Sequence, residues 1–140
     1  MTSRATLLDT NVLSELLSPN GDVKIRAFVE SLGNPLVSVV VFHELAYGVE
    51  MMPAGIKRAR LSAGIETFRN RFSQRMIPVD IEIAEIAGRL RAGETRSGYA
   101  LDAPDALIAA SALTIPARLA TRNLRHFERL GIELVNPWTL

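Results

Sequence analysis

The stretch Leu7–Leu17, LLDTNVLSELL, decides the fold. A short apolar run stops at Asp9, and valine and leucine then return at the three- and four-residue spacing of an amphipathic helix. This pattern predicts a buried strand that leads directly into a helix, with Asp9 at the carboxyl end of the strand. Ligands of open α/β sheets bind outside the carboxyl ends of the strands, so a carboxylate there suits a cation. Asp9 could equally cap the helix, because aspartate accepts hydrogen bonds from the free N–H groups of a first turn.

The alternation of strand and helix patterns continues along the chain. Helical patterns separate five short apolar or β-branched runs, which lie near residues 5–9, 36–40, 76–79, 118–120 and 132–135. The alternation predicts a three-layer α/β/α fold with a mostly parallel, roughly five-stranded sheet and right-handed crossovers. The length of 140 residues suits a single domain, 1–140.

The composition limits the chemistry. The chain has no cysteine, which excludes thiolate nucleophiles and cysteine-bound zinc. We interpret both histidines, His43 and His126, as structural or surface residues, because one imidazole without a partner does not make a metal or catalytic site. No apolar run reaches the length of a membrane span, and no apolar leader precedes Asp9. We therefore expect a cytoplasmic protein without a membrane partner.

Four polar side chains are expected at the carboxyl edge of the predicted sheet. They are Asp9 after the first strand, Glu44 on the helix after the second, Asp105 at the start of the helix before the fourth, and Asn123 after the fourth. Carboxylates about 4 Å apart repel each other by about 1 kcal/mol in water and about 4 kcal/mol near a protein surface. A cluster of such carboxylates is stable only if the pKa of one of them is raised or if a divalent cation offsets the repulsion. Oxygen ligands select Mg²⁺ or Mn²⁺ over zinc, and such an ion suits phosphodiester cleavage.

Two of the polar residues have an alternative role. Asp102 could add another carboxylate, but its place before Pro104 favours capping of the following helix. Asn123 could act at the site as a neutral group, or it could cap the short helix that leads to Phe127. The sequence leaves both roles of Asn123 open.

The motifs that carry these residues resemble the PIN-domain family, above all its VapC-like and FitB-like branch. They are DTNVLSELL (9–17), HELAYGVE (43–50), DAPDALIAASAL (102–113), ATRNLRHF (120–127) and GIELVNPW (131–138). The resemblance covers essentially the whole chain. It implies a Mg²⁺- or Mn²⁺-dependent endoribonuclease that acts as the toxin of a VapBC-type toxin–antitoxin system.

Position by position, the resemblance implies that Asp9, Glu44 and Asp105 are the metal-binding catalytic acids. Thr121 and Asn123 fall in the fourth motif. Many PIN domains have a fourth aspartate where this chain has Asn123. Because asparagine is a neutral ligand, a second ion would be held weakly or only with RNA bound.

The resemblance also implies the partners. They are an RNA substrate, a VapB-like antitoxin, operator DNA reached only through that antitoxin, and a second copy of the chain. Apolar side chains at Met51, Met52 and 56–72 that one domain would leave uncovered also predict association into a homodimer. The alternative function is that of a FitB-like PIN subunit, acting mainly within a DNA-bound toxin–antitoxin complex with little nuclease activity.

Overall fold

The computed structural model describes residues 4–140, in which five short strands alternate with seven helices. The strands are β1 (Thr6–Leu8), β2 (Pro35–Ser38), β3 (Met76–Ile77), β4 (Arg118–Ala120) and β5 (Leu134–Val135). The helices are α1 (Thr10–Leu17), α2 (Val23–Ser31), α3 (Val40–Met51), α4 (Ile56–Arg71), α5 (Ile81–Arg96), α6 (Ala103–Thr114) and α7 (Leu124–Phe127). All five predicted strands are present, and four are shorter than the runs that predicted them.

Two of the shortened strands end for identifiable reasons. Pro78 follows β3 and has no backbone N–H with which to continue the ladder. β2 ends at Ser38, whose hydroxyl accepts the N–H of Val40 at 3.2 Å as α3 begins. The apolar run at 36–40 is therefore divided between a strand and a helix, although valine favours strands.

The sheet has the strand order β3-β2-β1-β4-β5, and every neighbouring pair is parallel. Leu7 in β1 pairs with Leu36 in β2 on one side and with Leu119 in β4 on the other. The carboxyl ends of β2, β1 and β4 are thus neighbours at one edge of the sheet. The predicted α/β fold is confirmed, with a sheet that is parallel throughout.

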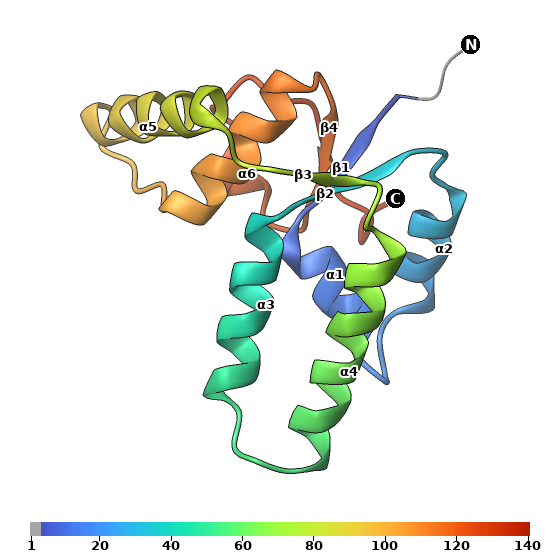
Figure 1. Cartoon of the computed structure of the whole chain (residues 1–140). Helices are drawn as coiled ribbons and strands as arrows, with labels where there is room; N and C mark the ends of the chain where they lie inside the picture. The colour runs from blue at the N-terminus through green and yellow to red at the C-terminus, as the bar shows by residue number, and fades with distance from the viewer. Residues whose placement is uncertain (1–3) are drawn as a thin grey trace.

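Helices cover the sheet on both sides. α1, α2, α3 and α4 lie on one side, whereas α5 and α6 lie on the other (Figure 1). The strand residues Leu7, Leu8 and Leu119 are fully buried, as expected for a parallel sheet covered on both faces. Small buried side chains on α6 allow α5 to pack closely along it; these are Ala106, Ala109, Ala110, Ser111 and Ala112. None of the helices in residues 4–140 is long and apolar enough to cross a membrane.

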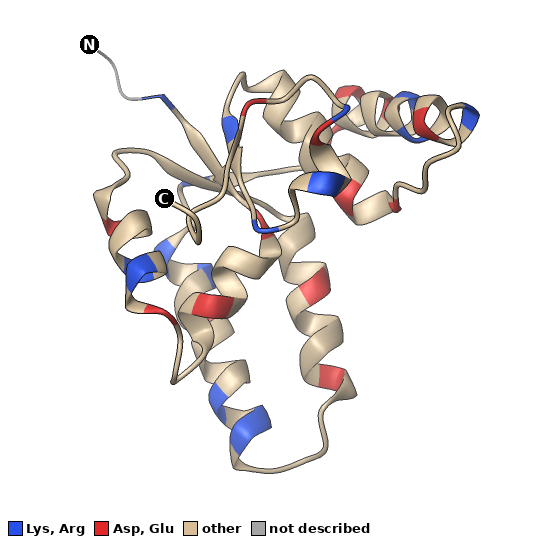
Figure 2. Cartoon of the chain, turned by 180° about the vertical axis from the view of Figure 1, so that it is seen from behind, with Lys and Arg blue, Asp and Glu red and all other residues tan. Residues whose placement is uncertain are grey.

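α3 and α4 form a helical hairpin that extends away from the sheet (Figure 1). Acidic residues lie along α3, whereas basic residues gather at the far end of α4 (Figure 2). Arg58 closes this end, because its guanidinium donates to Glu50 Oε2 at 3.0 Å and to the Met52 carbonyl at 3.1 Å. The hairpin is therefore held together at its tip as well as at its base.

Candidate functional site

Asp9 lies where β1 ends and α1 begins, and its side chain is almost fully buried. Its backbone N–H donates to the Ala120 carbonyl at 3.0 Å, next to the pairing of β1 with β4. Its Oδ1 accepts the N–H of Thr10 at 2.8 Å, so Asp9 is the N-cap residue of α1. The capping interpretation is confirmed for this oxygen, which leaves the second oxygen to be explained.

The loop after β4 holds the second oxygen of Asp9. Thr121 donates its hydroxyl to Asp9 Oδ2 at 2.7 Å, and Asn11 Nδ2 donates to the same oxygen at 3.3 Å. Thr121 Oγ1 also accepts the N–H of Asn123 at 3.0 Å within this loop, and Arg122 ties the loop to α1 by donating its N–H to Asn11 Oδ1 at 3.3 Å. Burial raises the pKa of Asp9 in spite of these hydrogen bonds. A buried carboxylate in this state is stabilised by a nearby cation.

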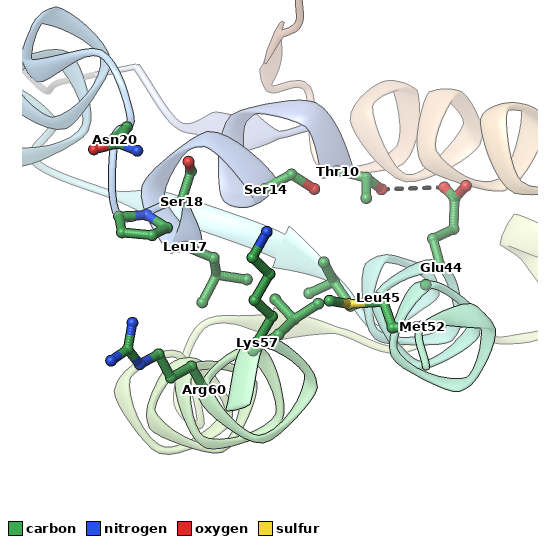
Figure 3. Close-up of a pocket in the computed structure, with 13 residues that line it drawn as sticks. Thr10, Ser14, Leu17, Ser18, Asn20, Glu44, Leu45, Met52, Lys57 and Arg60 are labelled. Atoms are coloured by element: carbon green, nitrogen blue, oxygen red, sulfur yellow. Dashed lines mark hydrogen bonds between the residues drawn. The ribbon is translucent and has the colours of Figure 1, made fainter. Parts of the chain in front are cut away.

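Glu44 lies on α3, just beyond the carboxyl end of β2. The hydroxyl of Thr10 donates to Glu44 Oε1 at 3.1 Å (Figure 3). Thr10 therefore contacts both acids, Asp9 through its N–H and Glu44 through its hydroxyl. Burial raises the pKa of Glu44, and the negative charges of Asp9 and Asp102 raise it further.

Asp105 lies in the first turn of α6, and its side chain is 16% exposed. Asp102 Oδ1 accepts the N–H of Asp105 at 2.9 Å, which confirms that Asp102 caps this helix. Burial raises the pKa of Asp105 to about 6, and the charges of Asp102 and Asp9 add to the effect. His126 Nδ1 lies 2.9 Å from Asp105 Oδ2. His126 is exposed, which confirms its interpretation as a surface residue, but the premise that its imidazole has no partner is wrong.

Asn123 occupies the N-cap position of α7, but its side chain makes no capping hydrogen bond. Its backbone N–H instead donates to Thr121 Oγ1, and its side chain is exposed. The geometry thus gives no support to the capping role, and it leaves the carboxamide beside the loop that holds Asp9.

The acids influence one another without forming a closed cluster. The charge of Asp9 raises the pKa of both Glu44 and Asp105. Within residues 4–140, no three Asp, Glu or His side chains are placed to hold one ion among them. Like charges favour such separation. The edge of the sheet therefore offers oxygen donors and an excess of negative charge.

Three polar residues at the site are not assigned to it from the sequence: Asn11, which contacts Asp9, and also Thr10 and His126. Thr10 follows Asp9 directly, so a hydroxyl next to the predicted strand end is the signal that points to it. His126 lies three residues after Asn123, about one helical turn, within the fourth motif. The hydrogen bonds of these last two residues reach partners distant in sequence, Glu44 and Asp105.

A groove of about 510 Å³ lies between α1, α3 and α4, and Glu44 is at one end of it (Figure 3). Lys57 and Arg60 line it from α4. Much of the remaining wall is apolar and includes Leu17, Leu45, Met52 and Leu61. The groove is therefore largely apolar, reaches Glu44 at one end, and carries the two basic side chains on its α4 side.

A family profile described as "PIN domain" matches residues 6–133, a span that contains all four predicted site residues. The chain belongs to the PIN-domain family. One relative of this PIN domain, VapC ribonuclease Y4jK of Sinorhizobium fredii, is 30% identical over 135 residues, which are 94% of this chain and 96% of that protein. The resemblance to the VapC-like branch is thereby confirmed.

Solved structures share the fold of this PIN domain. A chain of FitAcB from Neisseria gonorrhoeae is similar with a TM-score of 0.86 and 32% identity, over 96% of this chain and 99% of that one. A chain of VapBC2 from Rickettsia felis, bound to a promoter DNA fragment, has a TM-score of 0.79 and 25% identity, over 94% of this chain and 98% of that one. The FitB-like and VapC-like resemblances thus extend to the three-dimensional structure.

Proposed function

We propose that this PIN domain is a Mg²⁺- or Mn²⁺-dependent endoribonuclease and the toxin of a VapBC-type toxin–antitoxin system. The observation that carries the proposal is the set of three acids at the sheet edge, Asp9, Glu44 and Asp105, in which the charge of Asp9 raises the pKa of the other two. Their place in a chain that is 30% identical to a VapC ribonuclease supports the reaction class. The chemistry is hydrolysis of an RNA phosphodiester bond.

The donor set fits a divalent ion of the Mg²⁺ or Mn²⁺ type. Carboxylate oxygens are the ligands these ions prefer, and because burial raises the pKa of all three acids, a bound cation would favour their charged forms. Asp9, Glu44 and Asp105 would hold the ion together, one or two of them directly and the rest through bound waters, several of which Mg²⁺ usually keeps. When bound, it supplies positive charge for the scissile phosphodiester and activates water for hydrolysis.

The chain's own residues prepare these acids. Thr10 and Thr121 fix the two oxygens of Asp9, so that this carboxylate keeps one orientation. The hydroxyl of Thr10 holds Glu44 at the same edge. Asn123 lies next to Thr121 and would orient a water or a neighbouring acid without adding charge. Such preorganisation reduces the rearrangement needed when substrate binds.

The groove between α1, α3 and α4 is the surface we assign to the antitoxin. Its apolar wall suits the apolar face of a helix or strand, and its end at Glu44 would let a basic side chain of the partner reach the acids. A cation so placed would compete with the metal. DNA contact would come through the antitoxin. The DNA-bound VapBC2 complex supports the DNA-bound part of a second candidate function, in which the chain acts mainly as a subunit of such a complex. In that case its nuclease activity would be slight.

A cleavage assay on the purified, antitoxin-free chain tests the proposal. We expect RNA cleavage with Mg²⁺ or Mn²⁺ and none in EDTA. Asp9→Asn, Glu44→Gln and Asp105→Asn should each abolish it. The matched control is Asp22→Asn, because Asp22 is an N-cap of α2 outside the site and asparagine caps equally well. Cleavage that persists in all three site variants would contradict the proposal, and a wild-type chain that binds metal but cleaves nothing would favour the second candidate.

A further inference from the structure

The pairing of His126 with Asp105 is a side-chain contact at the site that the proposed function does not use. Nδ1 of His126 lies 2.9 Å from Oδ2 of Asp105. The two residues are 21 positions apart and come from different helices, α7 and α6. An ionised carboxylate only accepts hydrogen bonds, so the imidazole must carry a proton on Nδ1 when Asp105 is charged. The contact is then an N–H donated to the carboxylate.

The His126 side chain is 53% exposed, but the backbone that carries it is anchored to the core. Phe127, the next residue, is fully buried and anchors α7 against the core. The N–H of His126 donates to the Asn123 carbonyl at 3.2 Å, and α7 packs against α6. The carboxylate of Asp105 is itself mostly buried. Long flexible side chains in exposed pairs lose their interaction energy to conformational entropy, whereas this short, anchored pair has little freedom to lose.

We propose that His126 is a positioning residue that holds Oδ2 of Asp105 and so presents Oδ1 to the divalent ion. The inference rests on the proposed function only in that Asp105 is a metal ligand. Hydrogen-bond partners of ligating side chains orient the ligand, and their loss typically weakens metal binding by about 10- to 100-fold. His126 would orient Asp105 by a hydrogen bond to its Oδ2, as the Thr121 hydroxyl does for Oδ2 of Asp9. The imidazole touches neither substrate nor reacting atoms in this role.

Calorimetric titration with Mn²⁺ in the absence of RNA tests the inference. His126→Ala should raise the Kd for Mn²⁺ about 10-fold or more. His126→Asn, which restores an N–H donor on a side chain of similar reach, should recover most of the affinity. The control Thr67→Ala truncates an exposed side chain on α4 that lies outside the site, and it should leave the Kd unchanged. In cleavage assays, His126→Ala should raise the Mn²⁺ concentration needed for half-maximal rate and leave the KM for RNA unchanged at saturating Mn²⁺.

The outcomes separate this inference from the proposed function. A Kd of His126→Ala within about twofold of wild type would overturn the inference even if the protein cleaves RNA. Equal loss in His126→Ala and His126→Asn would also overturn it, because the donor would then not matter. Mn²⁺ binding that depends on His126 in a chain that cleaves no RNA would uphold the inference and refute the ribonuclease. If His126→Ala fails to fold, His126→Leu, which keeps bulk without a donor, gives the same comparison.

Discussion

Replacing Asp105 by asparagine should stabilise the metal-free protein near neutral pH, although it removes a site residue. The folded protein raises the pKa of Asp105 from 3.8 to about 6, chiefly through burial. Above about pH 6 Asp105 is therefore charged in the folded protein, and burial of that charge lowers the free energy of unfolding. Asparagine has the same shape, carries no charge, and can still accept the N–H of His126. The variant relieves the cost of the charge without leaving a cavity.

The size of the gain follows from the pKa interval. The shift from 3.8 to about 6 corresponds to about 3 kcal/mol without screening, which water at this partly open carboxyl reduces to about 1–2 kcal/mol. For a chain of this length, that gain is a rise in Tm of about 3–8 °C. The raised pKa means that a protonated Asp105 favours the folded protein. This stabilisation is fully present below pH 3.8 and is lost as the pH rises through about 6. The advantage of the variant over wild type should therefore be largest above pH 6 and should shrink towards pH 4.

Thermal unfolding in EDTA, followed from about pH 4 to about pH 7.5, measures this difference. The control Asp80→Asn replaces the N-cap of α5, which lies outside the site, by a residue that caps equally well, and its Tm should match wild type at each pH. Adding Mg²⁺ should stabilise wild type and not Asp105→Asn, because only the former gains from binding. A variant less stable than wild type at neutral pH, or a gain that does not change with pH, would refute the reasoning.

Three further predictions follow from the same structure. Asn123→Asp should lower the Kd for Mn²⁺ in a calorimetric titration, because affinity for hard cations rises with ligand charge, whereas an unchanged Kd would remove Asn123 from the site. Gly21→Ala should lower the Tm, since its Cβ would overlap the carbonyl oxygen of Glu15. Gly48→Ala has open space within α3 and should raise the free energy of unfolding by up to about 1 kcal/mol. Similar Tm changes in both variants would contradict this packing. Light scattering at micromolar concentration should give a homodimer of the 15.3 kDa chain, and a strictly monomeric mass would contradict the expected association.

The presence and parallel direction of the strands could be predicted, because the signal for each strand is local, whereas their order in the sheet was not predicted. Helical patterns separated the five apolar runs, and Asp9 marked where the first run ended. The residues at which strands end and helices begin were harder to predict, as the run at 36–40 shows. Its last residues begin α3, and valine alone does not reveal the change, since short apolar runs fit either structure. Capping by Asp80 and Asp102 was predictable from the same local chemistry.

The contacts around the acids could not be predicted, because they join residues far apart in sequence. Thr121 reaches Asp9 across 112 positions, which depends on β1 and β4 being neighbours in the sheet. The same limit applies away from the site. Glu94 is buried on α5 and accepts two hydrogen bonds from Arg129, at 3.0 and 2.7 Å, whereas the local sequence would indicate Arg91, three residues earlier on the same helix, as its partner.

Diffraction at the manganese absorption edge, from crystals grown with Mn²⁺, tests the central claim most directly, namely that the three acids form a metal site. The account predicts an anomalous peak bonded to the carboxylates of Asp9 and Asp105, within reach of Glu44, and no peak in crystals of Asp9→Asn. The absence of a peak at these carboxylates, in crystals of a protein that cleaves RNA with Mn²⁺, would contradict it.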